Sequence, residues 1–372
     1  MNRIVFYTQS LFKGGTERVV TLLAERFAVA GYDTTIATID QGDDEFTLSN
    51  RVRRVHVGLH PDDLSKGRLT RMYLRRKYLR DFLKRHKPDV VLSFLKWPIF
   101  YSLSAVSGLR IPVITAERSN PDVSFASRFD KLCARLLMRR AAGYVFQTKG
   151  QHDFFIPYIP RHKDNSVIIL NPLSAAYMNV PTAKREKSVV HHARIVDFKD
   201  QQLMIRAFVQ VHEKHPDYVL KIYGEDSHDG TKEYLEKLIN ELHARDYVFM
   251  LGGDVDFREV IPKGSVYLFS SYYEGLSNSV LEAMAMGMPI VATDCPCGGN
   301  RTLITDGVDG LLVPIREVEP MVHAVCRLIE DRDFAERLGN EARKITVRTD
   351  TENIFLQWRE YVKRVTNEYF SR

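Results

Sequence analysis

Two acidic residues eight positions apart, Glu274 and Glu282, are the side chains of this sequence best placed to do chemistry. Glu274 follows the apolar run 265–269, which is typical of a buried strand, and Glu282 falls in the first turn of a predicted helix. The residues between them favour a tight turn and a helix start: Gly275, Ser277, Asn278 and Ser279. Such a turn offers backbone N–H groups and a helix dipole to a phosphate. With two carboxylates for ribose and sugar hydroxyls, the spacing predicts a sugar-nucleotide site.

The same residues allow a second interpretation. Ser279 and Glu282 are spaced as a capping box, in which the glutamate only satisfies backbone donors at the helix start. Helix starts of this kind are common, so these residues alone leave both interpretations open.

Size and composition are those of a two-domain globular protein. The chain has 372 residues, of which 44% are hydrophobic and 27% charged, and its net charge is +6. The longest apolar runs fall well short of the roughly 20 residues that span a bilayer, and the first ten residues are typical of a strand rather than a signal peptide. Four cysteines without a disulfide or zinc spacing indicate reduced thiols in a cytoplasmic protein.

Short β-rich runs alternate with amphipathic helices in both halves of the chain, with six strands predicted in each half. This alternation predicts an α/β fold with two Rossmann-like, doubly wound parallel-sheet domains. We expect an N-terminal domain over 1–172, a linker over 173–187, a second domain over 188–350, and a final helix within 351–372 that packs back toward the first domain. Ligands of such sheets bind at the carboxyl ends of strands, so the cleft between the domains is the expected site.

Residues 66–87 are the most strongly charged stretch, with ten basic residues and one acidic residue. Leu69, Met72, Leu79 and Leu83 recur at helical spacing, which predicts an amphipathic helix with a basic face. Three interpretations stand side by side: a solvated face over a core helix, attachment to an anionic membrane, and contact with the phosphates of a substrate.

Three further loops at predicted strand ends offer groups for a diphosphate or a sugar. Gly15 belongs to a glycine pair that opens a helix and lets backbone approach a phosphate, although paired glycines also serve ordinary turns. Arg194 and Lys199 can neutralise a diphosphate, or they can be two surface cations on a loop. Gly224 lies at an abrupt strand end that can seat a base or a ribose.

Together these blocks resemble a family-4 retaining glycosyltransferase of the GT-B fold. The matching blocks cover most of the chain: GGTERVVTLLAERFAVAGYDTTIAT, ARIVDFKD, KIYGED, VFMLGGDV, SSYYEGLSNSVLEAMAMGMPIVATD and GGNRTLITDGVDGLLVP. The blocks VLSFLKWPIF, IPVITAERSNP and ILNP are similar to the PglH-like and amylovoran-type transferases, which extend polyprenyl-diphosphate-linked glycans.

The resemblance implies roles for particular residues. Arg194 and Lys199 match the basic pair that holds the donor diphosphate. Glu282 matches the carboxylate that binds the donor ribose, and Glu274 matches the one near the donor sugar hydroxyls. Three backbone positions complete the implied phosphate site: Gly15, Leu276 and Ser277.

One position departs from the family pattern. Arg118 fills the place of a histidine that many members carry after the strand predicted at 113–116, and a guanidinium cannot act as a base. Glu117 and Arg118 are therefore expected to orient the acceptor or its pyrophosphate, and a local salt bridge at the strand end is the alternative.

The implied function is the transfer of a hexose or N-acetylhexosamine from a nucleoside-diphosphate sugar, with UDP as the expected nucleotide, to a lipid-diphosphate-linked glycan. The first domain would bind the acceptor and the second the donor, and the process would belong to bacterial surface polysaccharide or glycan assembly. Front-face attack with retention needs no dedicated base, and the basic pair makes a metal or other cofactor unnecessary. A UDP-sugar epimerase of the same fold is the alternative, and its acid–base residues would surround one sugar carbon.

The resemblance also favours a role for the basic helix at the inner face of the cell membrane. A lipid-diphosphate acceptor lies at an anionic leaflet, which attracts basic residues. Arg75, Arg76 and Arg80 are the residues expected to meet this surface or the acceptor pyrophosphate. We therefore expect a cytoplasmic, peripheral membrane protein. Nucleic acid is not an expected partner, because no nucleic-acid-reading motif accompanies the helix.

Overall fold

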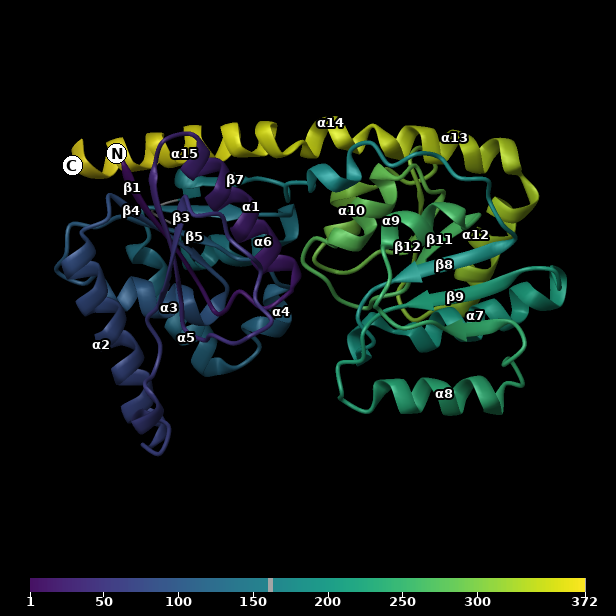
Figure 1. Ribbon diagram of the computed structural model, residues 1–372, viewed down its shortest axis with the longest axis horizontal. Coiled ribbons are helices and arrows are strands. Elements are labelled where there is room, and N and C mark those ends of the chain that lie inside the picture. The colour runs from purple at the N-terminus through teal and green to yellow at the C-terminus, as the bar shows by residue number, and fades with distance from the viewer. Residues whose placement is uncertain (160–162, 372) are drawn as a thin grey trace. The chain divides into compact units, whose positions relative to one another are not determined.

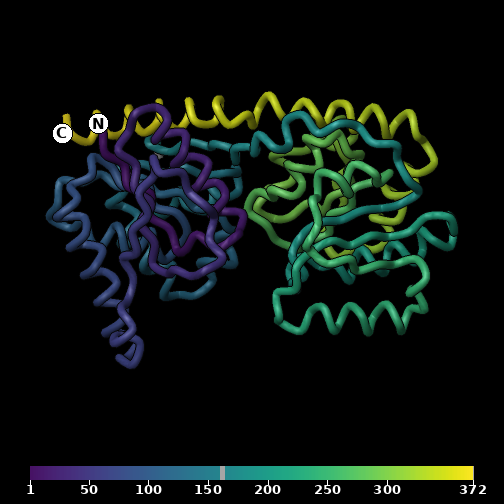
Figure 2. The backbone as a smooth tube through the Cα atoms, in the orientation of Figure 1, coloured from purple at the N-terminus to yellow at the C-terminus, as the bar shows by residue number. Residues whose placement is uncertain are grey.

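The computed structural model describes residues 1–159 and 163–371, and the chain divides into two units (Figure 1). The first unit combines residues 1–172 with residues 351–372, and the second comprises residues 173–350. Residues 173–187, expected as a linker, therefore fall within the second unit. The tube in Figure 2 lets the chain be followed through each unit separately.

The first unit contains a parallel sheet of seven strands in the order β3-β2-β1-β4-β5-β6-β7. The strands are β1 (Arg3–Thr8), β2 (Asp33–Thr38), β3 (Val52–His56), β4 (Val90–Phe94), β5 (Val113–Ala116), β6 (Gly143–Phe146) and β7 (Ser166–Ile168). β4, with the sequence VVLSF, is buried along its whole length. Near-continuous apolar strands of this kind are expected where both faces of a sheet are covered.

Helices pack on this sheet through apolar faces. They are α1 (Gly15–Val29), α2 (Arg68–His86), α3 (Lys96–Ala105), α4 (Pro121–Ser124), α5 (Arg128–Leu137), α6 (Lys149–Phe155) and α15 (Thr351–Ser371). Although α15 comes last in the chain, it packs against α1, with the ring of Phe355 5.0 Å from that of Phe27. Trp358 of α15 is fully buried beside Phe94 of β4. The terminal helix is thus part of the core of the first unit.

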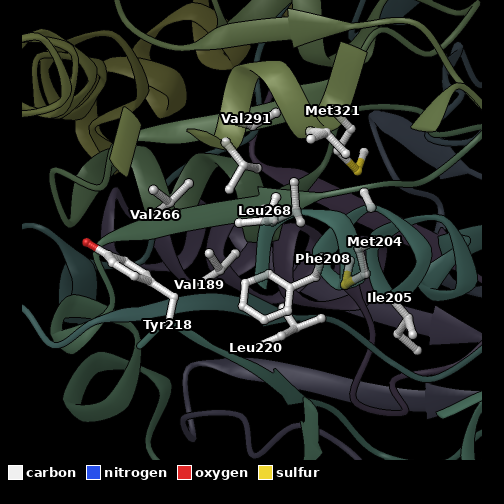
Figure 3. Close-up of a cluster of buried hydrophobic side chains, with 14 of the residues drawn as sticks. Val189, Met204, Ile205, Phe208, Tyr218, Leu220, Val266, Leu268, Val291 and Met321 are labelled. Atoms are coloured by element: carbon white, nitrogen blue, oxygen red, sulfur yellow. The ribbon is translucent and has the colours of Figure 1, made fainter. Parts of the chain in front are cut away.

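The second unit has a six-stranded parallel sheet in the order β10-β9-β8-β11-β12-β13. Its strands are β8 (Ser188–His192), β9 (Val219–Tyr223), β10 (Val248–Met250), β11 (Val266–Phe269), β12 (Ile290–Thr293) and β13 (Leu311–Val313). Its helices are α7 (Gln201–Lys214), α8 (Thr231–Glu241), α9 (Phe257–Val260), α10 (Asn278–Ala285), α11 (Gly299–Leu303), α12 (Val318–Glu330), α13 (Arg332–Arg343) and α14 (Ile345–Thr349). Figure 3 shows the core, where Phe208 of α7 and Met321 of α12 meet the strand residues Val189, Leu220 and Leu268.

Each sheet reverses its strand order at one point. The reversal lies between β1 and β4 in the first unit and between β8 and β11 in the second. Loops that leave neighbouring strands in opposite directions open a crevice at the carboxyl ends of those strands, which is where open α/β sheets bind ligands. We therefore expect a ligand-binding site among the residues that follow β8 and β11.

The predicted α/β class with two parallel sheets is confirmed. The prediction named neither β3 nor α3, and it also named none of the short helices α4, α6, α9, α11 and α14. β3 was not predicted because its sequence VRRVH is mostly polar and it pairs only with β2, at the edge of the sheet. α3 was not predicted because seven of its ten residues are buried, which removes the polar face that produces a helical period.

Candidate active site

Lys199 and Glu274 meet where β8 and β11 end. Their side chains form an ion pair, and they are only 13% and 14% exposed. The Ser271 hydroxyl also donates to Glu274 Oε1, at 3.2 Å, and the Ser270 hydroxyl donates to the backbone carbonyl of Lys199, at 2.8 Å. These bonds fix the loop after β8 against the loop after β11. Partial burial strengthens such a pair, because less water screens it.

Glu282 lies on α10, whose start differs from the prediction. The N-cap is Ser277, which accepts a hydrogen bond from the backbone N–H of Val280, so Ser279 is already helical. Glu282 therefore stands in the second turn and not in the first as predicted, and the alternative interpretation, a capping box with Ser279 as the cap, does not hold. Its Oε2 lies 3.0 Å from Nε2 of His192, the last residue of β8. The carboxylate is thus tied to the last residue of β8.

The N-terminus of α10 completes this end of the sheet. Leu276 and Ser277 are buried immediately before the helix. The backbone of this loop passes very close to Gly299, at the start of α11. A Cβ on Gly299 would lie 1.8 Å from the carbonyl oxygen of Gly275. Only glycine fits there. The sequence around Gly299 carries no local signal of this role, because the crowding comes from a loop more than twenty residues earlier.

Arg194 and Gly224 lie on the neighbouring loops of the same unit. Arg194 is exposed, and its backbone carbonyl accepts a hydrogen bond from Gln201, at 2.9 Å. A Cβ on Gly224 would lie 1.8 Å from the carbonyl oxygen of Ala193, so the ends of β8 and β9 are pressed together there. Gly224 is thus needed for the backbone path itself. The structure brings the predicted donor residues of the second unit to the carboxyl ends of its strands.

The remaining predicted residues belong to the first unit. Gly15 is exposed at the first position of α1. The Glu117 carboxylate accepts hydrogen bonds from the backbone N–H groups of Arg118 and Ser119, each at 3.0 Å, and burial raises its pKa. These bonds hold the turn after β5.

The Arg118 side chain is buried among aromatic rings. Its guanidinium carbon lies 5.5 Å from the ring centre of Phe94 and 5.4 Å from that of Trp358. Nη1 donates to Asn171 Oδ1 at 3.0 Å, and burial lowers the pKa of Arg118 to about 9. These contacts join β4, β5 and α15. A direct role of Glu117 and Arg118 toward an acceptor stays a prediction.

The arginines of the basic helix α2 fall into two groups, one bonded to backbone carbonyls and one lining a pocket. Arg76 Nε donates to the carbonyl of Ser104 at 3.2 Å, and Arg80 Nη1 donates to those of Ala105 and Ser107 at 2.5 and 2.6 Å. These two arginines cap carbonyls at the C-terminal end of α3 and just after it, where a helix dipole favours cations. The basic face expected from Arg75, Arg76 and Arg80 is therefore split.

Arg75 instead lines a pocket in the first unit. The pocket has a volume of about 260 Å³, and its walls are formed by Gln9, Ile39, Arg68, Arg71, Met72, Arg75, Trp97 and Tyr101. The Nε atoms of Arg71 and Arg75 are buried and have no hydrogen-bond partner within the described residues. Three guanidinium groups around one hollow favour an anionic ligand.

The apolar residues of α2 also differ from the prediction. Leu79 and Leu83 are buried in the core, but Leu69 is 81% exposed and Tyr73 is exposed as well, as is Leu64 before the helix. In Figures 1 and 2 the first turns of α2 extend away from the sheet of their unit. Only the second half of α2 is thus an ordinary core helix.

A second exposed apolar stripe lies on α5. Phe129, Leu132 and Leu136 follow one another at helical spacing and are all exposed. Basic residues interleave with them: Arg128, Lys131 and Arg135. Both α2 and α5 pack against α3.

Two further features bear on ligands and membranes. No helix of the described residues is long and apolar enough to cross a bilayer. Within the same residues, the His, Cys, Asp and Glu side chains grouped closely enough for a metal are His215, Cys326 and Glu330. This group contains none of the predicted donor-site residues.

Family models match both halves of the chain. The model of the glycosyl transferase 4-like domain matches residues 14–171, and that of the glycosyl transferases group 1 matches residues 178–345. The two matches together extend over most of both units.

Curated relatives span nearly the whole chain at low identity. An uncharacterized glycosyltransferase of Haemophilus influenzae is 24% identical over 361 residues, which are 96% of this chain and 99% of the relative. The N-acetylgalactosamine-N,N'-diacetylbacillosaminyl-diphospho-undecaprenol 4-alpha-N-acetylgalactosaminyltransferase of Campylobacter jejuni is 24% identical over 357 residues, 92% of this chain and 94% of the relative.

Solved structures share the fold. Anabaena HepE in complex with UDP and glucose superimposes with a TM-score of 0.83 at 19% identity, covering 98% of this chain and 100% of HepE. The lipopolysaccharide outer core galactosyltransferase WaaB in its apo form has a TM-score of 0.77 at 17% identity and covers 97% of this chain and 99% of WaaB.

Proposed function

We propose that this chain, which belongs to the glycosyltransferases of the GT-B fold, moves a hexose or N-acetylhexosamine from a UDP-sugar to a lipid-diphosphate-linked glycan. The observation that carries the proposal is the meeting of Lys199 and Glu274 at the strand-order reversal of the second unit, beside the N-terminus of α10. The relatives named above are transferases, which favours transfer over epimerisation.

The donor would bind at the carboxyl ends of β8 and β11. Lys199 and Arg194 offer positive charge to its diphosphate, and the N-terminus of α10 offers oriented backbone N–H groups. Glu274 and Glu282 then accept hydrogen bonds from sugar and ribose hydroxyls. HepE, which shares the fold, was solved with UDP and with UDP-glucose, and this supports the choice of nucleotide.

The transfer step depends on the negative charge that develops on the leaving diphosphate. The bond between the anomeric carbon and the diphosphate oxygen breaks, and a bond from that carbon to the acceptor hydroxyl oxygen forms on the same face. The hydroxyl proton passes to the leaving diphosphate oxygen. Lys199 and Arg194 stabilise the negative charge that grows on the diphosphate, so neither a protein base nor a metal is required.

The acceptor diphosphate would bind in the arginine-lined pocket of the first unit. Arg68, Arg71 and Arg75 surround it, and the unpartnered Nε atoms of Arg71 and Arg75 would gain acceptors from phosphate oxygens. The Campylobacter relative is named for an acceptor linked through diphosphate to undecaprenol, which supports an acceptor of this class.

Nucleotide binding tests the proposal directly. UDP at 100 times its dissociation constant should stabilise the chain by about 2.7 kcal/mol, which a thermal melt records as a rise of several degrees. GDP and ADP should raise the melting temperature less, and EDTA should leave the UDP effect unchanged. UDP release from a UDP-sugar should then require a polyprenyl-diphosphate glycan. Epimer formation without acceptor would instead support the epimerase, and loss of the UDP effect in EDTA would contradict the metal-free mechanism.

We also propose that the first unit docks on the anionic inner face of the cell membrane. The exposed apolar residues Leu69 and Leu136 stand among basic residues on α2 and α5, a combination typical of interfacial helices. Apolar side chains enter the interface while the cations meet anionic headgroups.

Flotation with vesicles containing anionic lipid checks this docking. The wild-type chain should float, and a Leu69→Ser, Leu136→Ser variant should lose at least about 100-fold in partition coefficient, since burying each large apolar side chain is worth roughly 1.5–3 kcal/mol. A Val29→Ser variant removes an exposed apolar residue from α1 and should float like the wild type. Wild-type protein that stays in the soluble fraction would contradict the docking.

A further inference from the structure

His192 is a buried histidine at the carboxyl end of β8 that no motif predicted. It follows His191 in the strand sequence SVVHH, and the polar pair at the end of an apolar strand is the one sequence signal that could have drawn attention to it. Its side chain is 5% exposed, and that of Glu282 is 6% exposed. Nε2 of His192 lies 3.0 Å from Oε2 of Glu282.

The surroundings leave the His192 ring little freedom. It stacks on Phe257 with ring centres 4.7 Å apart and meets Tyr267 edge-on at 5.6 Å. The Tyr267 hydroxyl donates to the backbone carbonyl of His192 at 3.2 Å. A ring clamped in this way can hold a partner at a fixed place, and that partner is the Glu282 carboxylate.

A carboxylate on the second turn of a helix otherwise has several rotamers to choose from. Fixing one of them before a ligand arrives removes an entropic cost of binding. It also keeps a buried carboxylate hydrogen-bonded, which burial demands. The His192–Glu282 contact joins β8 to α10, so it fixes the carboxylate relative to the sheet as well as to its own helix.

We propose that His192 is a positioning residue that aims Glu282 at the ribose hydroxyls of the donor nucleotide. The inference rests on the proposed function, because it needs a ribose at Glu282. His192 itself acts through Glu282 and touches no reacting atom. It therefore sets how strongly the site distinguishes a ribose from a sugar without these hydroxyls.

The test compares the affinities of UDP and 2′,3′-dideoxy-UDP by isothermal titration calorimetry. The wild-type chain should bind UDP more tightly, and His192→Phe should reduce the ratio of the two affinities by about tenfold while hardly changing the affinity for the dideoxy analogue. His192→Gln keeps an N–H near the position of Nε2 and should restore most of the ratio.

A matched control comes from the same strand. His191 is also buried, but its Nδ1 lies 2.8 Å from the carbonyl of Leu268, on β11. His191→Phe should keep the wild-type ratio. If His192→Phe does not fold, His192→Asn replaces it in the test. Asn has a shorter side chain, and the same reduction in the ratio of affinities is expected.

Each result has a distinct meaning. If His192→Phe lost the same factor of affinity for UDP and for the dideoxy analogue, the ratio of the two affinities would be unchanged. His192 would then be only a structural residue, and the inference would be overturned. A wild-type chain that binds UDP without preferring it over the analogue would overturn the ribose assignment of Glu282, and this inference with it, but not the proposed function. A wild-type chain that does not bind UDP would overturn both.

Discussion

A Lys199→Ala variant is expected to transfer sugar about 10²- to 10³-fold more slowly than the wild-type chain, the loss typical of removing one preorganised donor to a developing negative charge. Lys199 is partly buried and held by Glu274, so its charge is fixed before the donor binds. A fixed charge in a poorly solvated site needs no reorganisation when the diphosphate leaves. Steady-state turnover at saturating UDP-sugar is the measurement.

Two further variants separate chemistry from folding. Lys199→Ala leaves the partly buried Glu274 without its cation, which can also lower stability. Adding Glu274→Gln should recover the melting temperature but not the turnover. Lys221→Ala breaks a more exposed ion pair of the same unit, with Glu186, and should keep wild-type turnover. Near-wild-type turnover in Lys199→Ala would remove Lys199 from the mechanism.

Glu282→Ala should weaken UDP binding by about 10- to 100-fold, because hydrogen bonds to a charged group contribute roughly 1.5–3 kcal/mol. The variant loses the carboxylate expected to hold the ribose, and it also leaves the buried Nε2 of His192 without this partner. An unsatisfied buried polar group costs about 1–3 kcal/mol, so the melting temperature should fall as well.

Glu282→Gln is the matched variant for this residue. It keeps the shape and can still bond to His192 but loses the charge, so its affinity for UDP should lie between those of the wild type and Glu282→Ala. Calorimetry gives the affinities, and a melt without nucleotide gives the stabilities. UDP affinity in Glu282→Ala equal to that of the wild type would show that the ribose lies elsewhere.

Most of the fold was predictable because it depends on local patterns. Strands such as β11 are short apolar runs between loops, and helices such as α12 repeat their apolar residues at the period of a helix. The family was predictable from the block around Glu274 and Glu282, and the family models and relatives confirm it. β3 was missed because its sequence is mostly polar at the edge of the sheet, and α3 because its burial removes the polar face that marks a helical period.

The site was predictable only as a set of residues. Their chemical types and their places at strand ends follow from the sequence, but their partners do not. Lys199 and Glu274 are 75 positions apart, and His192 and Glu282 are 90 apart. No local pattern determines such contacts, because they arise only when the strands take their order in the sheet.

The sequence by itself therefore determined the fold class, the family and the residue types that could hold a sugar nucleotide. Only the tertiary structure decided which cations line a pocket and which stabilise the fold: Arg75 lines a pocket, whereas Arg80 caps α3 and Arg118 lies between Phe94 and Trp358. The physical reason is that a residue's type is local, while its burial and its partner depend on segments that are distant in the chain.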